Sequence, residues 1–207
     1  MRAIRKQNEP HSLTLHRNSQ HASYDNYQDK DRLRRSLVEE QQGICCYCMQ
    51  RIQPHSEGMK IEHWHCQTHY PVEELTYRNL LGACLGNEGQ PFKEQTCDTR
   101  KGDQTLARNP ADPTHPIEAF IRYLGNGRIE SHDPVFDQQL NEVLNLNHPN
   151  LVSNRRAILD SFLGSLGQGS KTANFWQLKL SEWNGDNGGQ LREYCGAVVY
   201  WLKKRLR

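Results

Sequence analysis

Seven cysteines and ten histidines give this 207-residue chain an unusual supply of sulfur and nitrogen metal ligands. Cys45 and Cys48 are spaced as Cys-x-x-Cys, so two thiolates on one tight turn can bind the same ion. A tetrahedral site needs a second pair, for which Cys84 and Cys97 are the best candidates. The twelve residues between them are rich in Gly, Asn, Gln and Pro, which suits a looped-out insertion. The spacing therefore predicts a structural Zn²⁺ site made of these four cysteines.

The remaining cysteines leave alternatives open. Cys46 shares the first turn and competes as a ligand, and Cys66 could form a local site with His65 and His69. Cys195 falls on the apolar face of a predicted helix and is expected in the core. The four predicted ligands could instead be small buried hydrophobic residues, since free cysteine is often buried. A disulfide framework is not expected, because the number is odd and no export signal is seen.

A second group of residues has the chemistry needed to hydrolyse a phosphodiester. Such a reaction needs an activated nucleophile and a cation that neutralises charge on the phosphoryl and leaving oxygens. His63 is a possible base, because an ordinary imidazole is largely neutral near pH 7. Glu62 and Asp98 are carboxylates that can bind Mg²⁺, and Arg100 and Lys101 are cations beside Asp98. Taken singly, each could be an ordinary surface residue.

The elements that must position these residues are short. We expect a helix at about residues 29–42, a strand at 59–65, a helix-compatible segment at 77–84, a polar loop at 86–96 and a helix at 97–108. Residues 1–28 have few apolar side chains and are expected to be loosely structured. After a Pro-containing linker at 109–113, two strands flank Gly125-Asn126-Gly127, which is typical of a hairpin. Helices are then predicted at about 134–145, 148–166, 171–183 and 190–206.

The order of these motifs resembles the HNH (His-Me finger) endonucleases. The resemblance covers about residues 43–103 and rests on the interleaved cysteines and on three motifs: Ile61-Glu62-His63-Trp64, Asn79-Leu80-Leu81, and Cys97-Asp98-Thr99-Arg100-Lys101-Gly102. It implies an α+β fold with a zinc-bound ββα core, an N-terminal arm and helix, and a mainly helical C-terminal region. The corresponding expected divisions are residues 1–28, 29–109 and 110–207.

The resemblance also implies a role for each residue of the motifs. His63 would be the general base, and Glu62 a ligand of a catalytic Mg²⁺ or Mn²⁺ ion. Asp98 stands where the family usually has Asn or His, and its carboxylate would be a second ligand of that ion. Asn79 would hold the loop and orient His63. Phosphate contacts would come from Arg100 and Lys101.

Further segments resemble the HNH nucleases of Septu-type and retron-associated anti-phage systems, the PtuB-like family. They include Met1-Arg2-Ala3-Ile4-Arg5-Lys6, Tyr24-Asp25-Asn26-Tyr27 and Val143-Leu144-Asn145-Leu146-Asn147. This resemblance implies cleavage of DNA in anti-phage defence, in complex with an ABC/SMC-like ATPase. Cleavage of RNA such as tRNA is an alternative, because no residue distinguishes a 2′-hydroxyl from hydrogen. A zinc-stabilised binding module without activity is another, because Asp98 departs from the family pattern.

Composition narrows the class of protein. No stretch approaches the ~20 apolar residues of a membrane helix, and residues 1–20 contain no apolar segment typical of a secretory signal, so we expect a cytoplasmic protein. The net charge is only +2. Basic runs at 32–35 and 203–207 could contact phosphate or simply be solvated, and the small net charge predicts weak nucleic-acid affinity for the isolated chain. Trp176, Trp183 and Trp201 are expected to be core residues.

Overall fold

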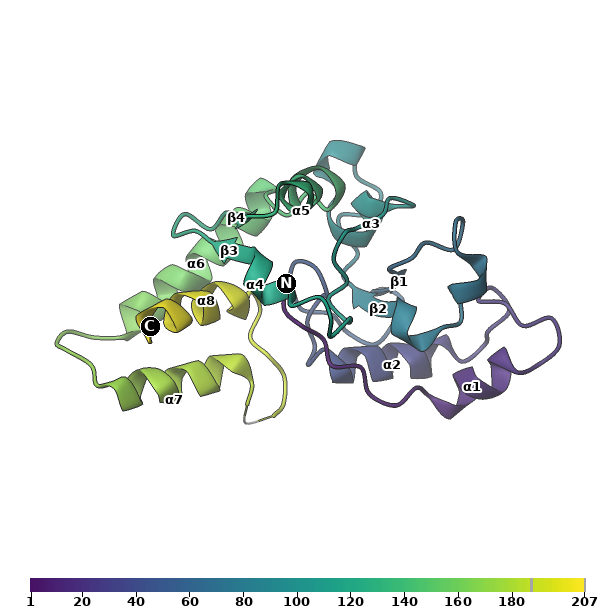
Figure 1. The fold of residues 1–207 in the computed structure, drawn as a ribbon, viewed down its shortest axis with the longest axis horizontal. Helices are drawn as coiled ribbons and strands as arrows, with labels where there is room; N and C mark the ends of the chain where they lie inside the picture. The colour runs from purple at the N-terminus through teal and green to yellow at the C-terminus, as the bar shows by residue number, and fades with distance from the viewer. Residues whose placement is uncertain (187, 207) are drawn as a thin grey trace.

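The computed structural model describes residues 1–186 and 188–206. It is a mixed α+β structure with two small sheets and a mostly helical C-terminal part (Figure 1). The elements of the first half are α1 (His11–Arg17), α2 (Lys30–Glu40), β1 (Lys60–His63), β2 (Leu80–Ala83) and α3 (Cys97–Lys101), with single 3-10 turns η1 (Pro71–Glu73), η2 (Tyr77–Asn79) and η3 (Phe92–Glu94).

An antiparallel pair of strands forms the centre of this half. β1 pairs with β2 in a register that sets His63 opposite Leu80 and Lys60 opposite Ala83. α2 packs against β2, and α3 follows after a loop, so two strands and a short helix succeed one another as β1, β2 and α3. A Cβ at Gly82 in β2 would lie 2.9 Å from Cδ1 of Ile52, so a larger residue there would require the Ile52 side chain to move.

Two helix predictions in this region are wrong. Residues 77–84 form η2 and then β2, since the strand pairs with β1 and all four of its residues are buried. The predicted helix at 97–108 ends at Lys101. Its C-cap, Gly102, has a φ of 52°, which turns the chain away from the helix, and a buried Leu106 follows in extended chain.

The N-terminal segment is ordered, contrary to the expectation for residues 1–28. Four of its apolar side chains are inserted into the main core, those of Met1, Ile4, Leu13 and Tyr27, whereas Leu15 is exposed. The amide of Ile4 donates to the carbonyl of Pro110. Polar contacts add to this anchoring, because the buried Lys6 ammonium binds the Glu40 carboxylate and the carbonyl of Leu80. Low apolar content therefore did not mean low burial.

The second half contains one small hairpin and is otherwise mainly helical. Its elements are α4 (Ile117–Phe120), β3 (Ile121–Tyr123), β4 (Ile129–Ser131), α5 (Pro134–Gln138), a π-helical turn η4 (Gln139–Val143), α6 (Pro149–Ser165), α7 (Ala173–Asn184) and α8 (Cys195–Arg205). The predicted hairpin and the helices at 148–166 and 171–183 are confirmed. The predicted helix at 134–145 is observed as two successive elements, α5 followed by the π-helical turn η4, which ends at Val143. The last helix begins at Cys195, five residues later than predicted.

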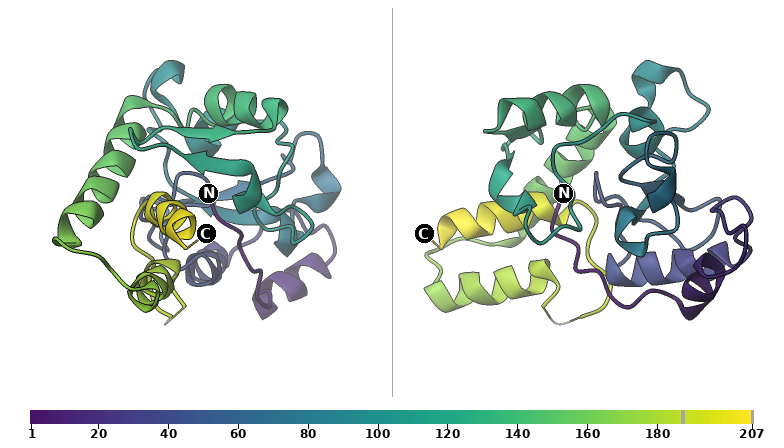
Figure 2. Two further views of the ribbon diagram at one scale, coloured as in Figure 1. Left: turned by 60° about the vertical axis from the view of Figure 1, so that its left-hand side comes forward. Right: turned by 45° about the vertical axis from the view of Figure 1, so that its right-hand side comes forward.

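α7 and α8 lie side by side, and α6 packs on α8 to enclose a second hydrophobic cluster (Figures 1 and 2). Trp183 and Cys195 are buried in it, and Trp176 and Trp201 pack against it partly buried, as expected for core residues. Of the basic run at 203–207, Arg207 lies outside the described residues. No helix among the described residues is long and apolar enough to cross a membrane.

Candidate metal and catalytic site

The structure brings the four predicted zinc ligands together. The sulfur atoms of Cys45, Cys48, Cys84 and Cys97 all lie within 4.8 Å of one another, and all four residues are buried. The Sγ atoms of Cys48 and Cys84 are 3.6 Å apart. Cys45 and Cys48 come from the turn before β1, Cys84 directly follows β2, and Cys97 begins α3. The cluster therefore joins both strands to the helix.

The donor set fits Zn²⁺. Burial by itself raises the pKa of the Cys45 thiol, but hydrogen bonds from the neighbouring thiols outweigh it and hold that pKa well below its ordinary value. Hydrogen bonds with Cys45 and Cys48 instead raise the pKa of Cys84 and of Cys97 well above the ordinary value, so the negative charge in the cluster is favoured on Cys45. Thiolates are the ligands of structural zinc. Cys97 has a φ of 56°, and its amide donates a hydrogen bond to the carbonyl of Leu144, which holds the backbone at this cluster residue. A four-cysteine structural zinc site is consistent with this arrangement.

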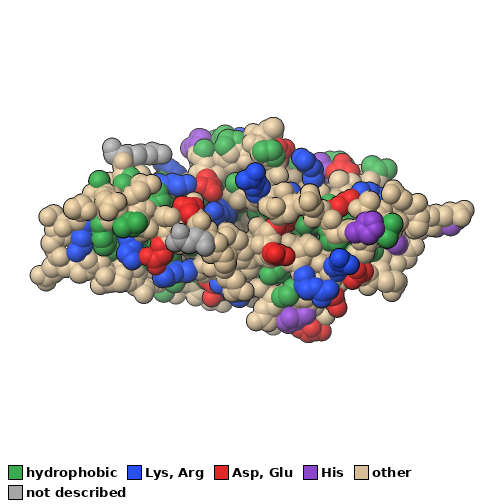
Figure 3. All heavy atoms as spheres, turned by 90° about the horizontal axis from the view of Figure 1, so that it is seen from below, with side chains coloured by type: hydrophobic (Ala, Val, Ile, Leu, Met, Phe, Trp, Pro, Cys, Tyr) green, Lys and Arg blue, Asp and Glu red, His purple; other side chains and the backbone are tan. Residues whose placement is uncertain are grey.

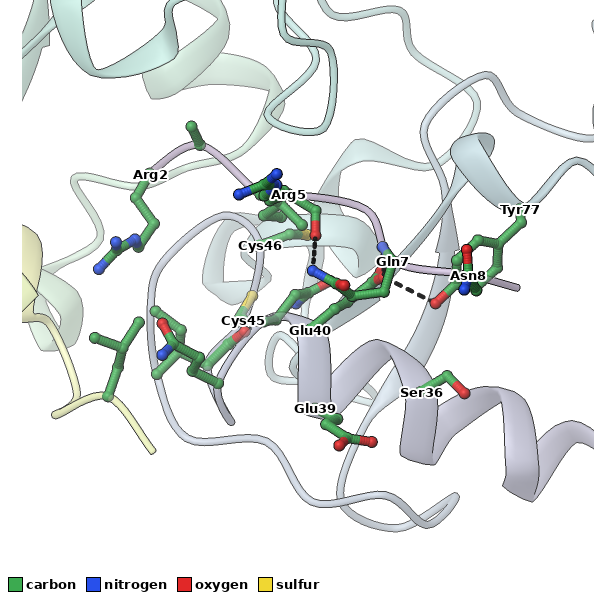
Figure 4. A pocket seen from close by; sticks show the side chains of 16 residues that line it. Arg2, Arg5, Gln7, Asn8, Ser36, Glu39, Glu40, Cys45, Cys46 and Tyr77 are labelled. Carbon is green, nitrogen blue, oxygen red and sulfur yellow. Dashed lines mark hydrogen bonds between the residues drawn. The ribbon is translucent and has the colours of Figure 1, made fainter. Parts of the chain in front are cut away.

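The competing cysteines lie outside the cluster. Cys46 is buried beside a cleft of about 600 Å³ between the N-terminal segment and α2 (Figure 4). Arg2 and Arg5 line one side of this cleft, and Ser36 and Glu39 line the other. Neither His63 nor Asp98 lines it. The cleft is therefore separate from the residues expected to carry out catalysis.

Cys66 forms a pair with His69, whose Nδ1 lies 3.3 Å from its Sγ. His65 turns elsewhere, because its Nδ1 is 2.8 Å from Oε2 of Glu73 and its ring stacks on Tyr70. The three residues do not converge on one point. Within residues 1–186 and 188–206, the cysteine cluster is the one group of three or more such ligands with all donor atoms within 4.8 Å.

His63 stands at the end of β1 in a defined orientation. Its Nε2 lies 3.0 Å from the carbonyl oxygen of Glu74. A carbonyl only accepts hydrogen bonds, so Nε2 carries the proton and Nδ1 of the neutral ring keeps its lone pair. Burial lowers the pKa of His63 below 6.5, against the opposing effects of the Glu74 carbonyl and the Asp98 charge. The ring is therefore a neutral base at pH 7, with Nδ1 as the basic atom.

Glu62 precedes His63 but points into the interior. Oε1 accepts from the Tyr47 hydroxyl at 2.6 Å and lies 2.9 Å from the Lys101 ammonium. Burial, and then the neighbouring Asp98 carboxylate, raise the pKa of Glu62 well above its ordinary value. Tyr47 and Lys101 both contact Oε1 of Glu62, so its other carboxylate oxygen is not used by them. Together with the Asp98 carboxylate, this oxygen is the type of ligand that suits a hard divalent cation.

Asp98 lies in the first turn of α3, across from β1. Its Oδ2 is 3.6 Å from the ammonium of Lys60, which also lies 3.2 Å from Glu88 Oε1 and from Thr99 Oγ1. The negative charge of the Asp98 carboxylate also helps to raise the pKa of Glu62. The end of β1 thus carries an imidazole and a carboxylate, and the opening of α3 carries a second carboxylate directly after the cluster residue Cys97.

Asn79 uses its side chain to close the segment between the strands. Its Oδ1 accepts from the amide of His65 at 2.7 Å, and its Nδ2 donates to the carbonyls of His65 and Glu73. The loop that it closes also supplies the carbonyl of Glu74 that fixes His63. Asn79 is therefore linked to His63 through backbone hydrogen bonds.

The two cations predicted to contact phosphate are occupied within the fold. Lys101 is only 1% exposed, and besides Glu62 it binds the carbonyl of His63 at 3.0 Å. Arg100 donates to the carbonyls of Phe92 and Glu142, and its guanidinium lies 3.6 Å from the centre of the Phe92 ring. The structure does not place either group at a free surface beside Asp98.

Three residues at the site were not singled out from the sequence. Tyr47 binds Glu62, Lys60 lies against Asp98, and the Tyr24 ring meets that of His63 edge-on at 4.5 Å between centroids. For Lys60 a signal existed, because residues two apart on a strand share a face and Lys60 precedes Glu62 by two. Tyr24 belongs to the segment Tyr24-Asp25-Asn26-Tyr27 that contributes to the family resemblance, but no spacing relates it to His63, which is 39 positions away.

The comparisons with known proteins give one distant relative. No protein-family model matches the chain. Over 129 residues, or 62% of this chain, it is 26% identical to Septu protein PtuB of Bacillus thuringiensis, and the match spans about half (49%) of that protein's length. The buried cysteine cluster and the paired strands described above thus belong to a chain that is distantly similar to a Septu protein.

Proposed function

We propose that this chain is a metal-dependent endonuclease of the HNH type that acts in Septu-type anti-phage defence. The observation that carries the proposal is the neutral His63 at the end of β1, with its Nδ1 unprotonated, beside the carboxylates of Glu62 and Asp98. The distant similarity to a Septu protein supports the biological setting.

In this mechanism His63 is the general base. Nδ1 takes a proton from water as the water attacks the phosphorus of a phosphodiester, the bond from phosphorus to the leaving oxygen breaks, and solvent protonates that oxygen. The ring is held in place through its Nε2–H bond to the carbonyl of Glu74. The positive charge that forms on the imidazole is stabilised by the nearby Asp98 carboxylate. Orientation and tautomer are therefore set before substrate binds.

Glu62 and Asp98 would hold a Mg²⁺ or Mn²⁺ ion, which would neutralise charge on the phosphoryl and leaving oxygens. Tyr47 and Lys101 hold Oε1 of Glu62, so the orientation of the carboxylate is determined by the fold. Lys101 also binds the carbonyl of His63 and is itself part of α3. It is a positioning residue that ties the helix bearing Asp98 to the strand bearing His63.

The zinc site has a structural role in this proposal. Its ligands lie on both sides of the site, because Cys84 follows β2 and Cys97 directly precedes Asp98. Four buried thiolates leave no open position at which a substrate would bind. A bound Zn²⁺ would therefore fix α3 against the strands and leave the reaction to His63 and its neighbours.

The substrate and partner are parts of the proposal that follow from the resemblance. We assign DNA as substrate and an ABC/SMC-like ATPase as partner. On the face seen in Figure 3, acidic and basic side chains are interspersed, in keeping with a net charge of +2. A chain with this charge gains little nonspecific affinity for nucleic acid, so a partner would supply much of the substrate binding.

The test is cleavage of plasmid DNA and of tRNA with Mg²⁺ or Mn²⁺, with and without an ABC/SMC-like ATPase of a Septu system. We expect nicking or cutting of the plasmid, lost in His63→Ala with the zinc content unchanged. His55→Ala is the matched control, since the side-chain hydrogen bonds of His55 are with the exposed Gln53 and Glu57. Cutting of tRNA alone would reassign the substrate, and no cutting of either would support a binding module.

A further inference from the structure

The site needs accessible positive charge, and the sequence-predicted cations do not supply it. Cleavage of a nucleic acid requires that the phosphates beside the scissile bond be held, usually by Lys or Arg. Lys101 is buried against Glu62, and Arg100 is bonded to two backbone carbonyls and stacked on Phe92. Other cations must therefore lie within reach of His63 and Asp98.

Lys60 is the cation on the Asp98 side. Its side chain is 30% exposed, and its ammonium lies 3.6 Å from Asp98 Oδ2. Its other partners, Glu88 and Thr99, are 3.2 Å away, and the Glu88 side chain is itself 59% exposed. Exposed pairs of this kind contribute little, so the ammonium can exchange Glu88 for a phosphate at small cost.

Lys30 is the cation on the His63 side. Its ammonium lies 4.5 Å from the centre of the Tyr24 ring, and that ring meets the His63 imidazole edge-on. The other contact of Lys30 is a long hydrogen bond of 3.4 Å to the carbonyl of Asp25. The Tyr24 hydroxyl forms no hydrogen bond within residues 1–186 and 188–206, and the charges of Arg34 and Asp98 act on it. Burial raises its pKa to about 12, so it remains a donor.

We infer that Lys60 and Lys30, with the Tyr24 hydroxyl, bind the phosphates of duplex DNA on the two sides of the His63–Asp98 site. This inference rests on the proposed function for its choice of substrate. The three donors come from β1, the start of α2 and the N-terminal segment, so they flank the base and the carboxylates from different elements. Lys60 forms ion pairs with Asp98 and Glu88, whereas no ion pair of Lys30 is formed among the described residues.

The test measures binding apart from cleavage. Full-length His63→Ala protein is titrated against a fluorescent DNA duplex at several salt concentrations, and Lys60→Ala and Lys30→Ala are added to it in turn. A phosphate contact contributes about 0.9 to the slope of log K against log salt for duplex DNA. Each alanine variant should therefore make the negative slope shallower by about 0.9. Lys60→Arg should restore the slope, because it keeps the positive charge.

Matched controls separate a phosphate contact from a general loss of charge. Lys179→Ala removes a comparably exposed lysine paired with Glu182 on α7, and Arg100→Ala removes the occupied arginine, so neither should change the slope. Tyr24→Phe should weaken binding without altering the slope, because it removes a neutral donor. Zinc content and melting temperature show that each variant is folded.

Unchanged slopes in both lysine variants, equal changes in Lys179→Ala, or no saturable binding at about 20 mM salt would overturn the inference. Cleavage by the wild-type chain is scored separately. If the wild-type protein cuts DNA while the slopes stay unchanged, the inference fails alone. If the slopes fall as expected but no DNA is cut, the enzymatic proposal fails and the binding assignment stands.

Discussion

Replacement of the buried Lys101 by methionine tests how the site is held together. Methionine fills much the same space without the charge, so the main change is that Glu62 loses its counter-ion while remaining buried. Both side chains of the pair are at most 2% exposed. Solvent screening is therefore slight, and breaking one side of such a pair costs about 3–5 kcal/mol. For a chain of this size that is a fall in melting temperature of roughly 6–20 °C.

The loss should depend on pH in a stated direction. The pKa of Glu62 is already raised by burial, and removing Lys101 raises it further. A carboxyl whose pKa is higher in the folded than in the unfolded state contributes stability to the fold below its unfolded pKa. This contribution to the free energy of unfolding is lost as pH rises through the folded pKa. Lys101→Met should therefore be more strongly destabilised at about pH 8 than at about pH 5.5, where Glu62 can take up a proton.

Thermal unfolding in Mg²⁺-free buffer across this pH range measures the effect. The double variant Lys101→Met/Glu62→Gln is the control, because it removes the unpaired charge while the amide oxygen can still accept from Tyr47. It should be more stable than Lys101→Met alone. A loss below about 1 kcal/mol, an equal loss at both pH values, or a double variant no better than the single one would refute the argument that a buried charge holds this site.

Three further predictions follow from the same geometry. Cys45→Ala should lower bound zinc, measured by mass spectrometry, and the yield of folded protein, whereas Cys46→Ala should leave about one zinc per chain, because only the former removes a sulfur from the cluster. The rate of DNA cutting at saturating Mg²⁺ should fall only below pH 6.5, because burial lowers the pKa of His63; an acid limb centred above that value would contradict the assigned environment of the base. Asn79→Ala removes three hydrogen bonds and should cost about 2–3 kcal/mol in chemical denaturation, with slower cutting; a loss below about 0.5 kcal/mol would show that the loop holds its shape without it.

Part of this site could be predicted from residue types and their spacing in the sequence. The convergence of Cys45 and Cys48 with Cys84 and Cys97 was predicted because metal ligands are chemically distinctive, and two thiolates separated by two residues meet on any tight turn. The placement of His63 on a strand was likewise predicted, and the structure ends β1 at that residue. Long helices with continuous patterning, such as α6, were also predicted with near-correct limits.

Burial and ion pairing were decided only by the tertiary structure. Lys101 and Glu62 lie 39 positions apart, and nothing local to Lys101 indicates that it faces a buried carboxylate. The same holds for Tyr24 against His63 and for the anchored N-terminal segment. The spacing of ligands and the periodicity of helices depend on neighbouring residues. Whether a charged group meets water or an opposite charge depends on segments distant in the chain, because burial changes its cost by several kcal/mol.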